Sequence, residues 1–559
     1  MSSFLNALQQ TNNLTQTQNG ANALKTTNSA VLDFFARMGA MRSVSETEIA
    51  EEFLKAYKED ALLATKALFY ARDVRGGLGE RRLFNTAFSA LMGYAPQTAS
   101  ANLHLLSEYG RWDDLIRLID NPVLEQQVVS IIKEQLQKDL NTESPSLLAK
   151  WMPSEKAGLS RRKAVKRLER KLEQNDNYWT NSEMRNRLES LKELDELTPS
   201  GVKLARKLIK LLDMTPKEYR QTLTALRKKI DLVEQRMSSN EWGTIEYGKL
   251  PSKSGLLYRK AFMRHDEERY NTYLESLTKG GKVNSKTLFP YELIAKIIDN
   301  DGDFVHSDEE YYDLYNAMWS QMGNFTSEDF GDSLVVLDTS DSMTWENNAL
   351  ALKTALSMGL YFTEHIKGRF SNKLITFSEQ PKFIEVRGLG FVDRVKNLYR
   401  DARYQMGYST NIEAVFSLLL NIVVAEKLPQ SELPKRIVII SDMEFNKAVG
   451  IGDPDRVPYN ISRESHERML NERFSTLFQT IRNSYLDKGY ELPKIVFWNV
   501  NGTNKQFPVS TNDEGVQLLS GHSKDILKAL VEEKASLTAY ELMESVLNDP
   551  RYDAVKVPF

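Results

Sequence analysis

The order of apolar and polar positions divides this chain into a helical part and a part that alternates between strands and helices. From residue 31 to about residue 140, apolar residues recur at three- and four-residue spacing, as at Ile49, Phe53 and Tyr57. This spacing places them on one face of a helix. Residues 143–290 show the same pattern in longer and more charged segments. After residue 327, short continuous apolar runs alternate with amphipathic stretches.

The apolar runs of the C-terminal part predict a parallel sheet with helices on both faces. They cover residues 333–338, 373–377, 436–441 and 494–500. An amphipathic stretch follows each run. The helices before residue 327 are short and closely spaced, which predicts an antiparallel helical array of the solenoid type. No fixed-period repeat supports that array, so its prediction depends on helix lengths alone.

We therefore expect an α + α/β protein with four segments. Residues 1–30 are rich in Asn, Gln and Thr and predict a mobile tail, because they offer little apolar surface to bury. Residues 31–145 form the helical array, residues 146–326 a basic helical domain, and residues 327–559 a doubly wound sheet domain.

Composition removes several classes of function. The chain has no cysteine, which excludes disulfides, thiolate metal sites and cysteine nucleophiles. It has no apolar run of membrane-spanning length, and residues 1–20 lack the pattern of a signal peptide. We therefore expect a cytoplasmic protein with no membrane partner. The six histidines lack metal-ligand spacing, and no phosphate-binding loop or nucleophile elbow occurs, so we expect no enzyme activity.

Positive charge is concentrated in the middle of the chain. Between Trp151 and Pro290, 30 Lys and Arg stand against 19 Asp and Glu, although the whole chain carries a net charge of -3. This distribution fits a polyanion such as RNA, and it also fits ordinary solvated helix faces. Nothing in it indicates DNA specificity. The candidate RNA contacts are Arg161, Arg162, Lys163, Lys166, Arg167, Lys203, Arg206, Lys207, Lys210, Arg227, Lys228, Lys229, Arg259 and Lys260.

A second basic feature is the glycine-rich turn at residues 72–82. Arg72, Arg75, Arg81 and Arg82 surround it. Their guanidinium groups, with backbone amides of the turn, could hold phosphate. The alternative, which we favour, is a tight turn between helices whose arginines pair with the acidic residues 73 and 80.

Three polar motifs in the C-terminal part fall where a doubly wound sheet places its ligand site. Asp338, Ser340 and Ser342 follow the first predicted strand, Thr410 precedes a predicted helix, and Asp442 follows the strand at 436–441. In such sheets, ligands bind beyond the carboxyl ends of the strands, at the point where the strand order reverses. The structural alternative is that the first two of these residues only cap the next helix.

Hydroxyl and carboxylate oxygens are the ligands of a hard cation such as Mg²⁺, which takes octahedral oxygen ligands at about 2.0–2.1 Å. We expect Ser340, Ser342 and Thr410 to bind Mg²⁺, or another divalent cation such as Mn²⁺ or Ca²⁺, directly. Asp338 and Asp442 would act through waters or orient the hydroxyls. With few anionic ligands, the cation would keep a position for a carboxylate from a protein partner.

The pattern Asp-x-Ser-x-Ser, a distant Thr and an Asp after a central strand resembles the metal-ion-dependent adhesion site of von Willebrand A domains. Two positions depart from that pattern. Asp341 stands where many such sites have glycine, and Met443 replaces the glycine of the common Asp-Gly pair. Both departures bear on metal affinity more than on the fold.

Beyond this site, the chain resembles the DUF2828 family of plant, fungal and viral proteins, whose function is not established. These proteins are similar to Ro-type (TROVE) RNA-binding proteins, in which helical repeats precede an A-type domain. The resemblance implies a HEAT-like or TROVE-like helical array that binds structured small RNA. The stretches that carry the resemblance are residues 71–82, 148–153, 239–242, 258–265, 288–291, 375–378 and 496–500.

Together, these observations predict a non-enzymatic, Ro-like RNA-binding scaffold with a metal-dependent recognition site in its A-type domain. The alternative is a protein-interaction or assembly module that uses the metal site without nucleic acid.

Overall fold

The computed structural model describes residues 12–154, 169–170, 201–300, 302–323, 332–345, 349–366, 368–377, 380–403, 407, 410–446, 476–503, 505–511, 513–524, 526 and 538–558. The chain divides into two compact units. One contains Met1–Ala101 and Glu246–Phe559, and the other contains Asn102–Ile245. The helices at the start of the expected array therefore belong to the same unit as the sheet, although the sequence pattern separates them.

The sheet of the first unit has six strands and confirms the predicted mixed α/β class. It contains β3 (Ser333–Asp338), β4 (Lys373–Phe377), β5 (Lys382–Glu385), β6 (Arg436–Ser441), β7 (Lys494–Asn499) and β8 (Val516–Ser520). The strand order is β5-β4-β3-β6-β7-β8, and only the pairing of β5 with β4 is antiparallel. All residues of β3 and β6 are buried, as expected for strands covered on both faces.

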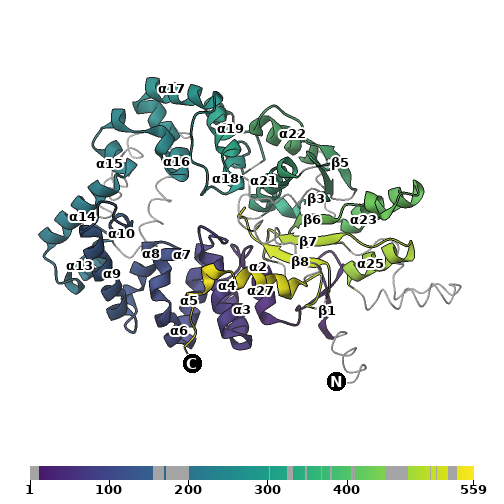
Figure 1. The fold of residues 1–559 in the computed structure, drawn as a ribbon, viewed down its shortest axis with the longest axis horizontal. Helices are drawn as coiled ribbons and strands as arrows, with labels where there is room; N and C mark the ends of the chain where they lie inside the picture. Colours follow the sequence, from purple (N-terminus) through teal and green to yellow (C-terminus); the bar gives the residue numbers. More distant parts are fainter. Residues whose placement is uncertain are drawn as a thin grey trace. The chain divides into compact units, whose positions relative to one another are not determined.

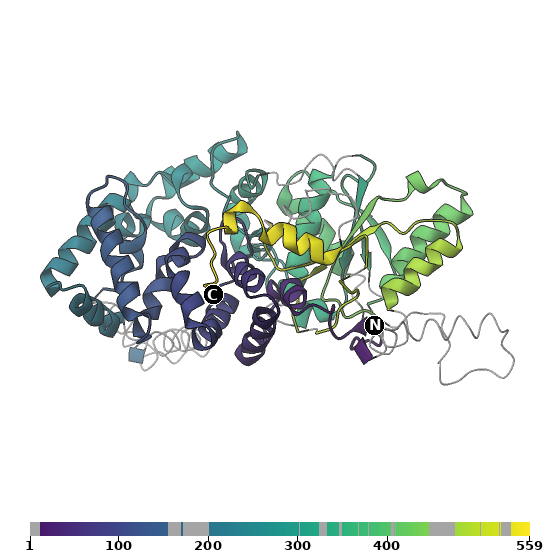
Figure 2. The ribbon, with the colours of Figure 1, turned by 60° about the horizontal axis from the view of Figure 1, so that its bottom comes forward.

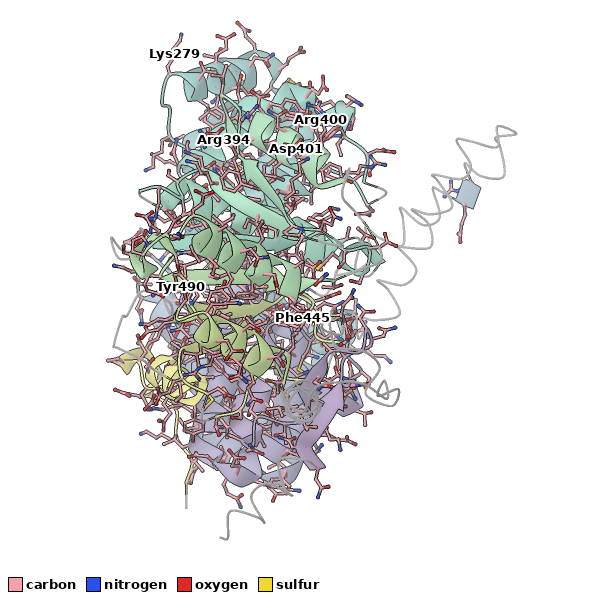
Figure 3. The ribbon with its side chains drawn as sticks, turned by 90° about the vertical axis from the view of Figure 1, so that its right-hand side faces the viewer. Lys279, Arg394, Arg400, Asp401, Phe445 and Tyr490 are labelled. Carbon is pink, nitrogen blue, oxygen red and sulfur yellow. The ribbon has the colours of Figure 1, made fainter. Side chains whose placement is uncertain are left out.

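Helices cover both faces of this sheet. Figure 1 and Figure 2 show α21 (Leu350–His365) on one side of the strands and α23 (Ile412–Ala425) with α25 (Leu477–Asp487) on the other. Figure 3 looks onto the face formed by α23 and α25, and it places Arg394, Arg400 and Asp401 along α22 (Phe391–Arg403). This is the two-faced covering that the continuous apolar strands predict.

The N-terminal helices of the first unit are α2 (Ala30–Met38), α3 (Glu46–Glu59), α4 (Ala61–Arg72), α5 (Arg81–Tyr94) and α6 (Pro96–Ala101). Side chains cap three of them at the N-terminus, since Ser29, Ser45 and Asp60 accept hydrogen bonds from backbone amides of the first turn. Their shared core is aromatic, with Phe53 against Phe34 and Phe69 against Phe84.

Helix α2 packs directly against the end of β8. A Cβ atom added to Gly39 would lie 2.2 Å from the Ser520 carbonyl oxygen, so the two backbones meet where only glycine fits. The Gly39 amide also donates to Ser520 Oγ at 3.0 Å. Farther along the chain, α27 (Ala539–Leu547) contacts both α4 and β8. The N-terminal helices and the sheet thus share one core.

Residues 246–323 add a second helical group to this unit. It comprises α16 (Ser252–His265), α17 (Glu267–Thr278), α18 (Pro290–Ile294) and α19 (Tyr312–Ser320), with the short 3-10 helices η4 (Tyr247–Lys249) and η5 (His306–Tyr311). Tyr247, Phe262 and Tyr270 pack together at its centre, with ring centroids 4.9–5.5 Å apart. α18 packs on α21, which joins this group to the sheet.

The regular elements of the second unit are all helices in its described residues. Its helices are η1 (Leu103–Leu105), α7 (Leu106–Tyr109), α8 (Trp112–Ile116), η2 (Arg117–Asp120), α9 (Glu125–Leu140), α10 (Leu148–Trp151), α13 (Gly201–Leu211), α14 (Pro216–Ile230), α15 (Val233–Ser238) and η3 (Trp242–Thr244). The solenoid arrangement stays a prediction. No helix in the described ranges is both long and apolar enough to cross a membrane.

The segment before α2 differs from the predicted mobile tail. Residues 1–11 lie outside the described residues, but β1 (Leu14–Gln16) and β2 (Asn22–Leu24) form an antiparallel hairpin, here called the N-terminal hairpin (residues 12–27). Thr17, Ala21 and Ala23 are buried. The prediction is wrong for this segment because small side chains and backbone bonds to the distant sheet domain order it, and composition reveals neither.

Candidate metal centre

The candidate site lies at the carboxyl ends of β3 and β6, which are neighbours in the centre of the sheet. From β3 the chain runs outward through β4 and β5, and it then returns to β6 and continues in the opposite direction. The strand order therefore reverses between β3 and β6, where doubly wound sheets bind ligands. Asp338 ends β3, and Asp442 follows the last residue of β6.

Three oxygens of the first loop are linked by hydrogen bonds. Ser340 Oγ donates to Asp338 Oδ1 at 2.6 Å, and the Ser340 amide donates to the same oxygen at 2.9 Å. Ser340 Oγ and Ser342 Oγ lie 3.0 Å apart. A serine hydroxyl that donates its proton to a carboxylate keeps lone pairs for a cation. The spacing expected from Asp-x-Ser-x-Ser thus brings these three side chains together.

The last residue of β6 contributes a further link that sequence reasoning missed. Ser441 Oγ donates to Asp338 Oδ2, so Asp338 joins the two central strands. Burial, and then repulsion by the Asp442 carboxylate, raise the pKa of Asp338 above its usual value. No lysine or arginine forms an ion pair with Asp338 among the described residues, and its three hydrogen-bond donors are all neutral. Two buried acids in such surroundings favour a bound cation.

Thr410 lies in a third loop, which is bonded to the loops of the other candidate ligands. It is buried, its amide donates to Asn446 Oδ1 at 2.9 Å, and its carbonyl accepts from the Asn446 amide at 2.9 Å. On the other side, the amide of Asp341 donates to the carbonyl of Gly407 at 3.0 Å. The loop of Thr410 is therefore bonded to both of the loops that follow β3 and β6.

The two departures from the A-type pattern have different structural consequences. Met443 adopts a positive φ of 67°, the left-handed conformation that favours glycine, and its side chain is buried. The backbone thus keeps the shape of an Asp-Gly pair with a larger residue in place. Asp341 is partly exposed, and its amide holds the Thr410 loop as described.

The donor set fits a hard divalent cation. Two carboxylates and three hydroxyls provide only oxygen ligands, as Mg²⁺, Mn²⁺ or Ca²⁺ prefer. Within the described ranges, no group of three or more His, Cys, Asp and Glu side chains surrounds a common point. A metal site built from three or more such side chains therefore has no support there, and the candidate set at Asp338 has two carboxylates with three hydroxyls.

A small recess adjoins the candidate site. Ser342, Arg42, Asn501 and His522 line it, together with apolar residues at the start of α21. Arg42 is held in place by Glu80, at 2.6 Å from Arg42 Nη2, and by the Tyr291 hydroxyl at 3.0 Å. The N-terminal segment therefore contributes Arg42 to a polar wall whose other polar residues come from the sheet domain.

The structure divides the candidate RNA contacts into three groups. Arg161, Arg162, Lys163, Lys166 and Arg167 lie outside the described residues. Five more make contacts within the chain, and these are Lys207, Arg227, Lys229, Arg259 and Lys260. The third group contains exposed residues of α13 and α14, whether or not they also have partners, and these are Lys203, Arg206, Lys210 and Lys228.

Two of these arginines have structural partners that a charge count does not reveal. Arg227 donates to the carbonyls of Ala149 and Met152 at 2.8 and 2.7 Å, which ties α14 to α10. Arg259 is buried and pairs with the buried Asp308. Their guanidinium groups are therefore used to hold the fold together.

Comparison with known families covers most of the chain. The model of a domain of unknown function, DUF2828, matches residues 17–197 and 123–324, which together span more than half of the chain. The chain belongs to the DUF2828 family. Another domain of unknown function, DUF7788, matches residues 332–554 and so covers the sheet domain. An uncharacterized protein of Acanthamoeba polyphaga mimivirus is 27% identical over 562 residues, covering 93% of this chain and 85% of the viral protein.

These matches confirm the predicted DUF2828 membership, including the viral relative. The similarity to Ro-type proteins stays a prediction. The glycine-rich turn, one of the stretches behind the DUF2828 resemblance, has a structural role in this chain. Its Asp73 is fully buried and binds Arg551, and Glu80 binds Arg42. The acidic residues are thus paired, as the favoured alternative expects, but with arginines from other segments.

Proposed function

We propose that this DUF2828 protein is a recognition protein that binds a divalent cation at the switch point of its sheet and uses it to capture an acidic group of a partner. The observation that carries the proposal is the cluster around Asp338. A fully buried carboxylate lies beside a second one, and its bonded neighbours are hydroxyls and an amide. Such an arrangement is costly without a cation to offset the charge.

Each residue has a defined part in this proposal. Ser340, Ser342 and Thr410 would supply hydroxyl oxygens, and Asp338 and Asp442 would orient them or hold waters. Bound Mg²⁺ supplies a Lewis-acidic centre that attracts a partner's carboxylate. The antiparallel edge strand β5 and the strand order are consistent with a von Willebrand A-like domain, which the motif at Asp338 resembles.

The recess at Ser342 supports a recognition role. An acidic group next to Ser342 would meet the polar side chains of Arg42 and Asn501. Because Glu80 already balances the charge of Arg42, this wall offers hydrogen bonds more than net attraction. Specificity for the partner would then depend on shape and hydrogen bonding around the cation.

Cation binding is tested with Mn²⁺, followed by electron paramagnetic resonance, and with Mg²⁺, followed by calorimetry. We expect one site in the parent chain and an affinity at least about 10-fold lower in Asp338→Asn, since such orienting carboxylates typically contribute 10–100-fold. Asp401→Asn is the matched control, because Asp401 is exposed on α22 (Figure 3) and should leave binding unchanged. Equal affinity in the parent and Asp338→Asn would refute the proposal.

RNA binding by the second unit is a second candidate function. Arg206 and Lys210 are exposed on α13, and Lys228 is exposed on α14. Phosphate contacts by such residues would make the affinity fall steeply with salt concentration. The proposal of a cytoplasmic, non-enzymatic ribonucleoprotein scaffold depends on this binding of RNA. It would be refuted if the chain bound structured RNA no more tightly than heparin.

A further inference from the structure

Thr410 is a candidate ligand whose position is not set by an adjoining strand of the sheet. Asp338 ends a paired strand and Asp442 directly follows one, whereas Thr410 precedes α23. Its position depends on Asn446, which binds both backbone groups of Thr410 at 2.9 Å, one through its side chain and one through its amide. Two bonds to a single residue fix both the position and the orientation of the Thr410 backbone, which carries the candidate hydroxyl.

The N-terminal hairpin holds the segment that contains Asn446. Its turn forms an antiparallel bridge between Gly20 and Asn446. The Gln18 amide donates to Glu444 Oε2 at 2.7 Å, and Asn19 Nδ2 donates to the Glu444 carbonyl at 2.6 Å. This segment begins two residues after Asp442, so the hairpin fixes the path of the chain as it leaves the candidate site.

A buried bond completes this contact. Thr17 Oγ1 donates to the Phe445 carbonyl, and both residues are buried. The Phe445 ring packs on Phe497 of β7 at 6.0 Å between centroids. The segment is therefore held between the hairpin and the sheet.

The hairpin has its own anchors on the sheet domain. Leu24 and Phe507 exchange two backbone bonds of 2.8 Å, and the amide of Thr511 donates to the carbonyl of Thr27 at 2.9 Å. The Asp33 carboxylate in α2 accepts from the Thr27 hydroxyl at 2.6 Å. These bonds do not involve the segment of Asn446, so the hairpin can act as a fixed support for it.

We propose that Asn446 and the N-terminal hairpin are positioning elements of the metal centre, which they complete by placing Thr410. This inference rests on the proposed function. None of these residues would contact the cation; they would set its affinity through Thr410. Because coupling between two sites is reciprocal, cation binding should in turn stabilise the hairpin.

The affinity of the full chain for Mn²⁺ tests the positioning role. Asn446→Ala removes the acceptor for the Thr410 amide, and we expect a loss of roughly 10- to 100-fold, the range for residues that orient metal ligands. Asn446→Asp keeps an acceptor oxygen and should bind no more weakly than the parent. Thr17→Val keeps the side-chain shape without the hydroxyl, and we expect a smaller loss than in Asn446→Ala, because Thr17 acts on Thr410 only through the segment of Phe445 and Asn446. Gln16→Ala, an exposed change in the same hairpin, is the control.

Hydrogen exchange provides a second measurement, which distinguishes coupling to the metal centre from a purely structural role of the hairpin. On addition of Mg²⁺, the amides of Gly20 and Leu24 should exchange more slowly in the parent but not in Asp338→Asn. A general loss of folding in Asn446→Ala would instead speed exchange in distant strands such as β8 without cation.

The outcomes separate the two proposals. If the parent binds Mn²⁺ and Asp338→Asn does not, but Asn446→Ala and Thr17→Val bind as the parent does, the positioning role is wrong and the metal centre stands. If Asn446→Asp binds Mn²⁺ more weakly than the parent, the role of the residue 446 side-chain oxygen as acceptor for the Thr410 amide is also wrong. A parent chain that binds neither Mn²⁺ nor Mg²⁺ overturns both proposals.

Discussion

Met443 offers a sharp test of the backbone geometry at the candidate site, because two truncations of its side chain should differ in an unusual direction. Its φ of 67° lies in the left-handed region, and its side chain is buried. For an L-residue this conformation costs roughly 1–2 kcal/mol, whereas glycine adopts it without a steric penalty. Met443→Ala loses the buried side chain and keeps the strain. Met443→Gly loses the same side chain and relieves the strain.

The loss of a buried methionine side chain costs about 2–5 kcal/mol in either variant. Glycine should then recover about 1 kcal/mol relative to alanine. Both variants are therefore expected to be less stable than the parent, with alanine the worse of the two. In an ordinary helix or strand the order would be reversed, since glycine there costs about 0.5–1 kcal/mol more than alanine.

Native-state hydrogen exchange of the β6 amides is the suitable assay. A chain with two units need not unfold in one step, so a local opening free energy is more informative than a global midpoint. A difference of 1 kcal/mol corresponds to about fivefold in the exchange rate. If Met443→Ala protects β6 as well as or better than Met443→Gly does, the reasoning about strain at this position is refuted.

Three further predictions concern other parts of the chain. Burial, and then the charge of Arg42, lower the pKa of His522 well below its usual value. The stability that neutral His522 contributes is therefore present above about pH 6.5 and is lost as the pH falls. The melting temperature of His522→Gln should decline less between pH 7 and pH 5 than that of the parent. Asp73→Asn removes the buried carboxylate that binds Arg551 and should destabilise this contact by about 1–3 kcal/mol. We expect earlier proteolysis near the C-terminus, and an unchanged cleavage rate would be the contrary result. Reversal of charge at Arg206 and Lys210 should reduce RNA affinity and its salt slope without changing Mn²⁺ affinity, and unaltered RNA binding would exclude the α13 surface.

The sheet was predictable where its strands are continuous apolar runs. β3, β4, β6 and β7 match the expected ranges closely, because burial on both faces leaves an unbroken apolar signal. β5 and β8 were not predicted. β5 is a four-residue edge strand with three exposed positions, and Gln517 interrupts β8. Neither has enough apolar residues in sequence to stand out from a loop.

The candidate metal centre was partly predictable for a similar reason. Asp338 and Asp442 follow neighbouring parallel strands, and a general rule for such sheets brings them to one edge. The roles of Ser441 and Asn446 depend on hydrogen bonds between loops, which residue types alone do not indicate. Thr17 and Phe445 are 428 positions apart, so no local pattern could have joined the hairpin to the site.

A count of charges identified a basic segment of the chain, but it did not identify which of the cations in that segment face solvent. Lys207 pairs with Glu125 at 2.7 Å, and that hydrogen bond is the main cause that raises its pKa. Arg227 binds one backbone carbonyl in α10 and one directly after it. A sequence gives the same weight to a cation that holds the fold together and to one that faces solvent, and only the positions of their partners separate the two.

The close approach of Gly39 to Ser520 and Gly521 has a practical consequence for how this protein can be divided. The DUF7788 match begins at residue 332, which invites expression of the sheet domain as a fragment. Such a fragment would lack α2, and its β8 end would present to water the surface that the Gly39 backbone covers in the intact chain. A homology boundary and a folding boundary therefore differ here, because residues 12–101 and 246–323 pack in the same unit as the sheet.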